Sequence, residues 1–565
     1  MSDQSKVTHL LDMCSALEQT AMKDRSTWER VVKKVMPHLV DAAYNREIDT
    51  KDRKPRICTR ANMNVHKLAS AHMSYIFPQG NKWFRLESWN QGGDTEPADD
   101  DWYAQMSDLM QAAIERSNFY TETYSTVIDR CAPGTGAMFI DMEKESKRLR
   151  FTHIPAGSYA IGQDSAHVVD KLVRNFYYTP VQMADAFGVD NLPERVKVML
   201  NNANEKFTAQ IHIKHIVMPR HQMTGERYYS VPTERPFASF YISVDDKFIL
   251  EEGGYFEFPF MVTRFLRVGN AVYGESPLIG MEDTIDDLMV SDECLKLMGQ
   301  RAALPSLVHP ADMVGQVDLR AGGRTIIPMQ YVNAPHAIRE LAPVGNYPMA
   351  IDQKKMQEEL LDDGMYIGGL QVFSNHDRNM TATEVTERSE EKLILFYPSF
   401  AQNREDFMSA IDRIFGLCFR AGILPGEGLS DVPEELMSER VDEEGRKGIY
   451  FESPRVKYCG RMAQAMERVH SSAMQNIMAI AAQWSQLTQD PSPVMQLRVA
   501  QMFRYLMMIS GIPAKFIKSM QEVEDEMAEL KEARRRQQDA EANKLASEAN
   551  FNNAKSDNLR AQYNL

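Results

Sequence analysis

Residues 260–277, FMVTRFLRVGNAVYGESP, determine how the fold of this chain is interpreted. The run begins with Phe260–Leu266, whose β-branched and aromatic residues favour a short strand. It ends with Ser276 and Pro277, a pair typical of a helix start, because serine can accept a bond from a free backbone N–H and proline has none to lose. A helical pattern then continues to about Ala302. We therefore predict a strand, a turn and a long helix in direct succession.

The segments that follow extend this plan. Pro and Gly residues interrupt residues 304–347, a second helical stretch comes next, and a glycine-containing polar loop covers 367–380. A long helix is expected from Thr381, because Thr381 and Glu384 form a capping box, and Pro398 predicts a kink or break within it. Two helices around a small insert, then a loop and a kinked helix, suit a part that lines a passage better than an enzyme core.

The regions on either side combine helices and strands. Residues 1 to about 130 have mostly helical spacing, with a break expected near Pro37, and helical spacing returns after about residue 460. Residues 522–565 are rich in Glu, Lys, Arg, Gln, Ala and Asn and lack apolar anchors. Short strand-like runs lie between these regions, at 139–142, 159–161, 209–213 and 239–242. The sequence therefore predicts a predominantly helical α+β protein.

Length and composition restrict the class of protein. With 565 residues the chain can bury a large core, and 43% hydrophobic and 25% charged residues are ordinary for a globular protein. No apolar run is long enough to cross a bilayer and the N-terminus has no apolar signal core, so no membrane partner is expected. Six cysteines without a CxxC pair favour buried free thiols over a zinc site or a disulfide framework.

The charge of the chain bears on nucleic-acid binding. The net charge is −15, whereas a protein that grips DNA by its phosphates needs positive charge in at least one patch. This argues against a sequence-reading DNA binder and agrees with a conduit that does not hold DNA tightly. The first long helix has an acidic side that either faces solvent or lines a channel, made of Glu282, Asp283, Asp286, Asp287, Asp292 and Glu293.

Motifs for catalysis are missing from the sequence. We find no P-loop, H-E-x-x-H pair, nucleophile elbow or dinucleotide fingerprint, and the thirteen histidines form no ligand-spaced cluster. The acid pairs Asp286–Asp287 and Asp362–Asp363 do not share a helix face, as a nuclease site would require. We expect no catalytic residue, no cofactor and no metal.

Several motifs resemble those of the head-to-tail connector, or portal, proteins of short-tailed bacteriophages. They are RFLR at 264–267, YGESP at 273–277, NMTATEV at 379–385, IFP at 76–78 and WFRL at 83–86. Weaker matches are GTG at 134–136, Ser453-Pro454 and the helical stretch 494–510 before Gly511-Ile512-Pro513. Each motif is short. The resemblance depends on the motifs following one another in the same order as in that family, over about residues 60–513.

The resemblance implies a portal-type fold of wing, stem, clip and crown whose copies form a ring. Its parts would be a wing at 1–275, a stem helix at 276–303, a clip at 304–347, a second stem helix at 348–366, a tunnel loop at 367–380, a long kinked helix and further wing at 381–450, and a C-terminal helical crown and tail at 451–565. The chain departs from the family pattern at Pro398, at 455–458 and in its short tail, which leaves the kink position and the crown size open.

The resemblance also implies a function and partners. The chain would form a ring at one capsid vertex, of twelve copies if the number usual in the family applies, through which DNA is packaged and later ejected and to which the tail attaches. Its partners would be the terminase large subunit, a tail adaptor, the capsid and scaffolding proteins, and double-stranded DNA in the channel. It would occupy the virion, and the host cytoplasm during assembly. The ring number, the phage and the identity of the adaptor stay open.

The loop 367–380 is the candidate functional site that this resemblance implies. We expect it to protrude into the channel at its narrowest point, held at one end by the cap residues Thr381 and Glu384. Phe373 would wedge or anchor the loop, and donors for DNA phosphates would come from Asn375, His376, Arg378 and Asn379. A plain connector without DNA contact is the alternative for this loop.

Two other classes of protein stay open. A DNA-packaging nuclease needs carboxylates that converge from separate strands, and the sequence offers no such strand-end acids. A non-ring tail adaptor or scaffold protein needs no tunnel-lining loop. A ring with a central hole is expected only from a portal protein, so microscopy distinguishes the three.

Overall fold

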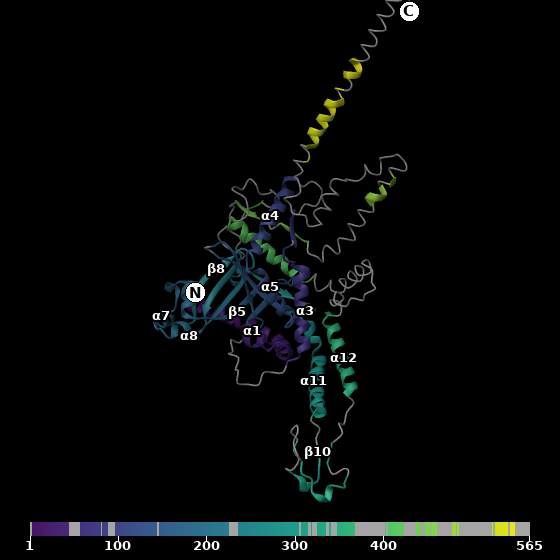
Figure 1. The fold of residues 1–565 in the computed structure, drawn as a ribbon. Helices are drawn as coiled ribbons and strands as arrows, with labels where there is room; N and C mark the ends of the chain where they lie inside the picture. Colours follow the sequence, from purple (N-terminus) through teal and green to yellow (C-terminus); the bar gives the residue numbers. More distant parts are fainter. Residues whose placement is uncertain are drawn as a thin grey trace, which may run out of the picture. The chain divides into compact units, whose positions relative to one another are not determined.

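The structure is a computed structural model of the 565-residue chain (Figure 1). The residues it describes are 3–43, 57–80, 82–88, 97–143, 146–224, 235–303, 307–314, 318, 325–334, 338–340, 347–367, 402, 405–422, 437–441, 447–451, 454–459, 477–481, 483–484, 523, 526–538, 540 and 543–547. Helices and antiparallel strands both occur, so the predicted mixed class is confirmed.

The chain forms two compact units. The first comprises Met1–Gln79, Glu115–Ile414 and Asp442–Arg446, and the second comprises Gly80–Ile114, Phe415–Val441 and Lys447–Leu565. The first unit holds both larger sheets and most of the described helices.

A five-stranded antiparallel sheet forms the centre of the first unit. Its strands lie in the order β4-β5-β6-β7-β8. Their bounds are Tyr159–Gln163, Val169–Tyr178, Ile211–Pro219, Phe237–Ser243 and Phe248–Tyr255. Helices α6 (Pro180–Phe187), α7 (Glu194–Asn201) and α8 (Glu205–Thr208) and the short η1 (Val189–Asn191) are inserted between β5 and β6, and α9 (Arg220–Thr224) follows β6. Helix α6 begins with a capping box, in which Thr179 and Gln182 exchange bonds.

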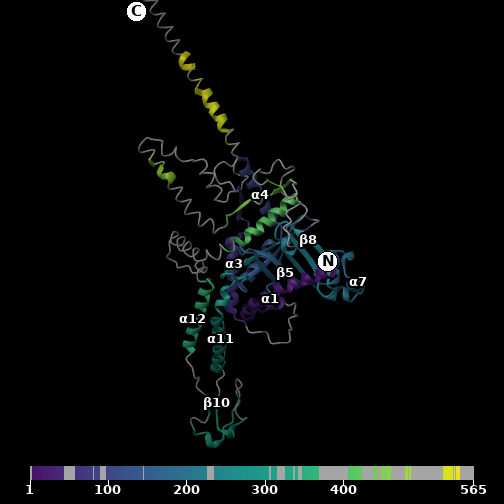
Figure 2. The same cartoon turned by 180° about the vertical axis from the view of Figure 1, so that it is seen from behind.

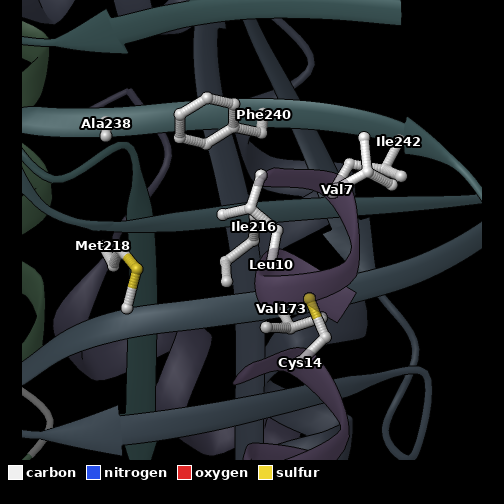
Figure 3. Close-up of a cluster of buried hydrophobic side chains, with 9 residues drawn as sticks. All are labelled: Val7, Leu10, Cys14, Val173, Ile216, Met218, Ala238, Phe240 and Ile242. Atoms are coloured by element: carbon white, nitrogen blue, oxygen red, sulfur yellow. The ribbon is translucent and has the colours of Figure 1, made fainter. Parts of the chain in front are cut away.

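Helix α1 (Asp3–Val35) covers one face of this sheet (Figure 3). Val7, Leu10 and Cys14 follow one side of the helix at helical spacing and are buried. They contact side chains on the face of the sheet that α1 covers. These are Val173, Ile216, Met218, Ala238, Phe240 and Ile242. The break predicted near Pro37 is confirmed, because α2 (Pro37–Ala43) begins there.

The second sheet packs against the other face. It has three antiparallel strands in the order β3-β2-β9, with bounds Leu149–Ile154, Thr135–Met142 and Phe260–Arg264. Phe139, Phe260 and Val262 share a buried cluster with Leu172 and Val217 of the larger sheet. The strand predicted at Phe260 is therefore a buried edge strand of a sheet sandwich.

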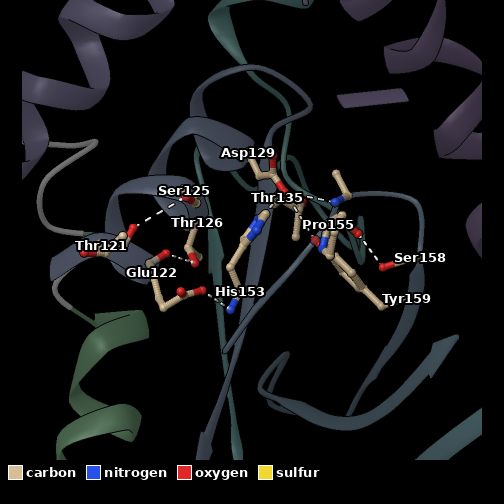
Figure 4. A network of polar contacts seen from close by, with 11 residues as sticks. Thr121, Glu122, Ser125, Thr126, Asp129, Thr135, His153, Pro155, Ser158 and Tyr159 are labelled. Carbon is tan, nitrogen blue, oxygen red and sulfur yellow. Dashed lines mark hydrogen bonds and ion pairs between the residues drawn. The ribbon is translucent and has the colours of Figure 1, made fainter. Parts of the chain in front are cut away.

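Two further helices support the smaller sheet. Helix α5 (Phe119–Cys131) leads directly into β2, and α3 (Thr59–Ile76) lies beside α5. A network of polar contacts joins α5 to β3 (Figure 4). Asp129 is fully buried and accepts hydrogen bonds from His153 Nε2 at 2.8 Å and from the Ala156 N–H at 2.9 Å. Burial disfavours the charged imidazole, but the hydrogen bond and charge of Asp129 outweigh it and raise the pKa of His153.

After β9 the chain enters two long helices. The predicted helix is interrupted at Met281, giving α10 (Pro277–Gly280) and α11 (Glu282–Ala303). The insert that follows contains β10 (Leu307–Val308), η2 (Ala311–Met313), η3 (Met329–Tyr331) and β11 (Arg339–Glu340). Helix α12 (Tyr347–Gly364) returns along α11, and the two helices lie side by side in both views (Figures 1 and 2).

The second unit contains two small sheets. Strand β1 (Phe84–Glu87) pairs with β14 (Arg455–Tyr458), and β12 (Met437–Val441) pairs with β13 (Lys447–Phe451). Phe84, Arg85 and Leu86 of the motif WFRL therefore lie on a strand paired with the segment 455–458. Helix α4 (Pro97–Glu115) provides the Ser107 hydroxyl that accepts from the Leu86 N–H at 2.9 Å.

Candidate functional site

The residues predicted to contact DNA lie outside the described residues. These are Phe373, Asn375, His376, Arg378 and Asn379, and the same holds for the cap residues Thr381 and Glu384. The structure does describe the two helices that lead to this loop, the junction from which they start and the insert between them. We therefore build the candidate site from those parts.

The junction is a close contact between two glycines. The Phe265 N–H donates to Gly134 O at 2.9 Å, and the Gly274 N–H donates to the Thr135 hydroxyl at 2.8 Å. A Cβ on Gly134 would lie 2.3 Å from Gly274 O, and one on Gly274 would lie 2.5 Å from Gly134 O. The motifs GTG, RFLR and YGESP, separate in sequence, therefore meet at one point.

Ser276 and Pro277 form the predicted helix start. Ser276 occupies the N-cap position of α10, but no side-chain capping bond is present. Its hydroxyl donates instead to Ala132 O at 2.7 Å, at the end of α5. This bond ties the beginning of the two-helix element to the sheet-bearing body.

Polar bonds hold α11 and α12 together. The Ser291 hydroxyl donates to Gln357 Oε1 at 2.9 Å, and Lys354 Nζ lies 2.6 Å from an Asp292 oxygen. Toward the body, the sulfur of Met281 is so close to Gly364 that a Cβ there would lie 2.3 Å from it. The two helices therefore form an antiparallel hairpin with a defined register.

Helix α1 clamps the base of α11. Arg30 forms two bonds to the Glu282 carboxylate, at 2.7 and 2.5 Å, and Lys34 reaches both Glu282 and Asp286. The hydrogen bond from Arg30 holds the pKa of Glu282 below its ordinary value. Two of the acids on the predicted acidic side are thus engaged with the body of the same chain.

Helix α3 clamps the base of α12 through Asp362. This carboxylate is buried, accepts from Arg60 Nε and Asn64 Nδ2 at 2.9 and 2.8 Å, and also bonds Arg60 Nη2. Burial opposes the charge, but the bonds from Arg60 and Asn64 outweigh it and lower the pKa of Asp362. Its sequence neighbour Asp363 is exposed.

The insert between the helices exposes apolar side chains. Strands β10 and β11 close it, and the Tyr331 hydroxyl donates to Asp312 Oδ2 at 2.8 Å. Met329 is 89% exposed and Ile326 is 78% exposed, and Val314 and Val332 are also exposed. Such a concentration on a short insert indicates a surface that another molecule covers.

The helix after the predicted loop packs on the smaller sheet. Residues 405–420 are helical, and this helix buries apolar side chains, which are Phe407, Ile411, Ile414, Phe415 and Cys418. Asp406 accepts a hydrogen bond from the Arg264 N–H at 2.9 Å, and burial raises its pKa to about 6. The IFP motif meets this helix, because the rings of Phe77 and Phe407 are 4.2 Å apart.

No catalytic constellation emerges from the described parts of the chain. In those ranges, no three His, Cys, Asp or Glu side chains are grouped so that they could hold a metal ion. A cavity of about 270 Å³ lies between α1 and the larger sheet, and two of its lining residues, Glu18 and Lys214, form an ion pair at 2.8 Å. None of the helices in the described ranges has the length and apolarity to cross a bilayer.

Comparison with known proteins assigns the chain to a family. Residues 7–517 match the model of the bacteriophage head to tail connecting proteins. The chain belongs to this family. It is 24% identical over 473 residues to the portal protein of Salmonella phage epsilon15, covering 81% of this chain and 79% of that protein. It is 25% identical over 427 residues to the probable portal protein of Bordetella phage BPP-1, covering 71% and 73%.

Family membership confirms the resemblance drawn from the short motifs. The matched range contains the glycine junction, both long helices, their insert and the helix 405–420. Sequence reasoning missed the anchoring residues Arg30, Lys34, Arg60 and Asn64. Their partners lie about 250 to 300 positions away, so spacing along the chain carried no signal for them.

Replacing Asp362 with Ala should destabilise the base of α12. Arg60 and Asn64 would lose a buried acceptor, which costs about 2 kcal/mol in the free energy of unfolding. Asp363→Ala is the matched control, because an exposed position should change that free energy by no more than about 0.5 kcal/mol. Urea unfolding followed by tryptophan fluorescence measures both, and equal effects would contradict the clamp.

The glycine junction can be tested by comparing two glycines with positive φ. Gly134→Ala should cost on the order of 3 kcal/mol, since its φ is +104° and the new Cβ would meet Gly274 O. Gly269→Ala, with φ +56° and no atom within 4 Å of the added Cβ, should cost about 1 kcal/mol from backbone strain alone. Thermal unfolding that ranks the two variants the other way would argue against a tight junction.

Proposed function

We propose that the chain is a portal protein that forms a closed ring at one capsid vertex. The ring is the conduit through which terminase packages DNA and through which DNA is ejected, and the tail attaches to it. The observation that carries this proposal is the match of the connector family to residues 7–517, together with two relatives whose names contain the words portal protein. The role is structural, without catalysis.

We assign the parts of the ring as follows. The paired helices α11 and α12 are the stem, and residues 304–347 are the clip. Residues 1–275 and the helix from 381 onward form the wing, and residues 451–565 form the crown and tail. The ring has twelve copies, related head to tail. It sits in the virion, having been assembled in the host cytoplasm.

The clip is the docking surface for other proteins. Its described part exposes Val314, Ile326, Met329 and Val332, and apolar side chains at the end of a two-helix projection suit a surface that exchanges partners. We propose that it meets the terminase large subunit during packaging and the tail adaptor afterwards. The capsid and scaffolding proteins meet other parts of the ring.

The tunnel loop is the contact with double-stranded DNA. Of residues 367–380 only Ile367 is described, and it is buried at the end of α12, so the loop starts from a fixed point. One arginine and one histidine in each copy give weak contacts to phosphate, which agrees with a chain whose net charge is −15. Phe373, Asn375, His376, Arg378 and Asn379 are the contact residues.

The assembly state of the purified chain tests the portal proposal. Mass photometry should show a particle of about twelve times the 64.5 kDa chain, and negative-stain images should show a ring with a central hole. A folded chain that remains a monomer or a twofold dimer at micromolar concentration would contradict the proposal. A larger assembly that is not a ring would favour the adaptor or scaffold role.

The loop is tested by the double change Arg378→Ala and His376→Ala. Losing one phosphate contact per copy should weaken DNA retention in a packaging assay, by about threefold to tenfold, with ring assembly unchanged. Arg420→Ala is the matched control, since Arg420 lies at the end of the helix 405–420 and outside the loop. Unchanged retention in the double variant would remove the loop from the DNA contact and leave the ring proposal standing.

A further inference from the structure

A buried carboxylate on α5 depends on a single imidazole. Among the described residues, His153 is the only basic side chain that bonds Asp129, and the Asp129 side chain is fully buried. His153 Nε2 donates to Asp129 Oδ2 at 2.8 Å, and the same oxygen accepts from the Ala156 N–H at 2.9 Å. The second carboxylate oxygen, Oδ1, is buried and accepts no hydrogen bond from the described residues. The charge of Asp129 can therefore be compensated only when His153 carries a proton.

The surroundings of His153 favour that proton. Glu122, also on α5, accepts from the His153 backbone N–H at 2.8 Å, so a second carboxylate lies beside the ring's own residue (Figure 4). On the neighbouring strand, β2 places the apolar Met138 opposite His153. Burial opposes the charged imidazole, but the hydrogen bond from His153 to Asp129 and the charges of Asp129 and Glu122 outweigh it and raise the pKa of His153.

The end of α5 that carries Asp129 also supports the base of the two-helix hairpin. The backbone oxygen of Asp129 accepts from the Gly134 N–H at 3.1 Å, and Gly134 belongs to the glycine junction. The cap residue Ala132 accepts from the Ser276 hydroxyl at 2.7 Å. One turn of helix therefore connects β3, through the Asp129 side chain, to the glycine junction and to the start of α10.

We propose that Asp129 and His153 form a proton-dependent lock between α5 and β3, which sets how firmly the glycine junction and the start of α10 are held. The protonated imidazole gives Asp129 a charge-assisted hydrogen bond and neutralises its charge. The neutral imidazole still donates one N–H, but it leaves the buried carboxylate uncompensated. The lock belongs to the single chain, so it goes beyond the proposed portal function and does not require a ring.

The lock is closed in mildly acidic solution and weakens as the pH rises. The pKa of His153 is higher in the folded chain than in the unfolded chain, so the folded chain binds this proton more tightly. The stabilisation is therefore complete below the ordinary histidine pKa of about 6.5, and it is lost as the pH rises through the higher value of the folded chain.

A second titratable group lies at the same junction. Asp406 accepts from the Arg264 N–H at 2.9 Å, and burial raises its pKa to about 6 although Arg130 and Arg264 lie near it. The stabilisation from a protonated Asp406 is also lost as the pH rises, through a pH of about 6. Variants are therefore compared with the wild type at equal pH, so that the contribution of Asp406 is the same in both.

His153→Gln in the full-length chain tests the lock. Glutamine can donate an uncharged hydrogen bond to Asp129, but it takes up no proton in this pH range. Hydrogen–deuterium exchange of the peptides covering residues 128–136 and 262–276 is followed by mass spectrometry at about pH 5.5 and about pH 8.5. At the lower pH these amides should exchange about fivefold to tenfold faster in the variant than in the wild type, because a charged hydrogen bond is stronger than a neutral one. At the higher pH the two chains should agree within about twofold.

His9→Gln is the matched control, because His9 is an exposed residue of α1. This variant should exchange like the wild type at both pH values. A ratio between His153→Gln and the wild type that is the same at both pH values would overturn the lock. Exchange of the imidazole C2 hydrogen in the wild-type chain gives a readout that needs no variant, and a pKa of His153 at or below that of His9 would overturn the lock as well.

The outcomes separate the lock from the portal proposal. If the wild-type chain forms a ring and the exchange ratio does not change with pH, the lock is overturned and the portal proposal stands. If the wild-type chain forms no ring, the portal proposal fails, whereas a pH-dependent exchange ratio in that same chain would still support the lock.

Discussion

The close backbone contact between Gly134 and Gly274 is the constraint on which the rest of the first unit depends. It brings the end of α5, the start of β2 and the segment after β9 within hydrogen-bond distance. A side chain at either position would push these backbones apart. The two glycines therefore determine the direction in which the chain leaves the sheet sandwich. Ser276 then uses its hydroxyl to hold the first helical turn against α5.

Charged side chains help to hold the paired helices α11 and α12 to the body. Arg30 and Lys34 on α1 engage Glu282 and Asp286, and α3 engages the buried Asp362. The Arg30 side chain is 65% exposed, so its ion pair orients α11 more than it stabilises it, whereas the Lys34 side chain is 25% exposed. Asp362 is different, because a buried carboxylate with a bidentate arginine is costly to leave unpaired.

Much of the first unit could be predicted from local pattern, and the failures have physical causes. The strand at Phe260 and the break at Pro37 depend on local side-chain chemistry and were found. Strand β5 was missed because half-buried polar residues interrupt its apolar alternation. Ser276 lies at the predicted N-cap position, but its hydroxyl makes no capping bond because the distant carbonyl of Ala132 takes it instead.

The functional assignment came from the order of short motifs rather than from a cluster of reactive groups. GTG, RFLR and YGESP proved to be neighbours in space, which explains why short motifs far apart in sequence can identify one structural unit. The acidic side of α11 shows what the sequence pattern could not predict. Pattern alone left its carboxylates either solvated or channel-facing, whereas Glu282 and Asp286 pair with α1. Such pairing depends on tertiary contacts that helical periodicity does not encode.

The contact between Met281 and Gly364 sets how closely α11 and α12 approach each other at their base. The helices approach closely at the base because one of them presents bare backbone there, and Lys354 with Asp292 holds them further along. A side chain at position 364 would spread the base while that ion pair kept the distant part closed. The two helices would then be farther apart at the base than near the insert. A single missing Cβ thus sets the taper of the whole element.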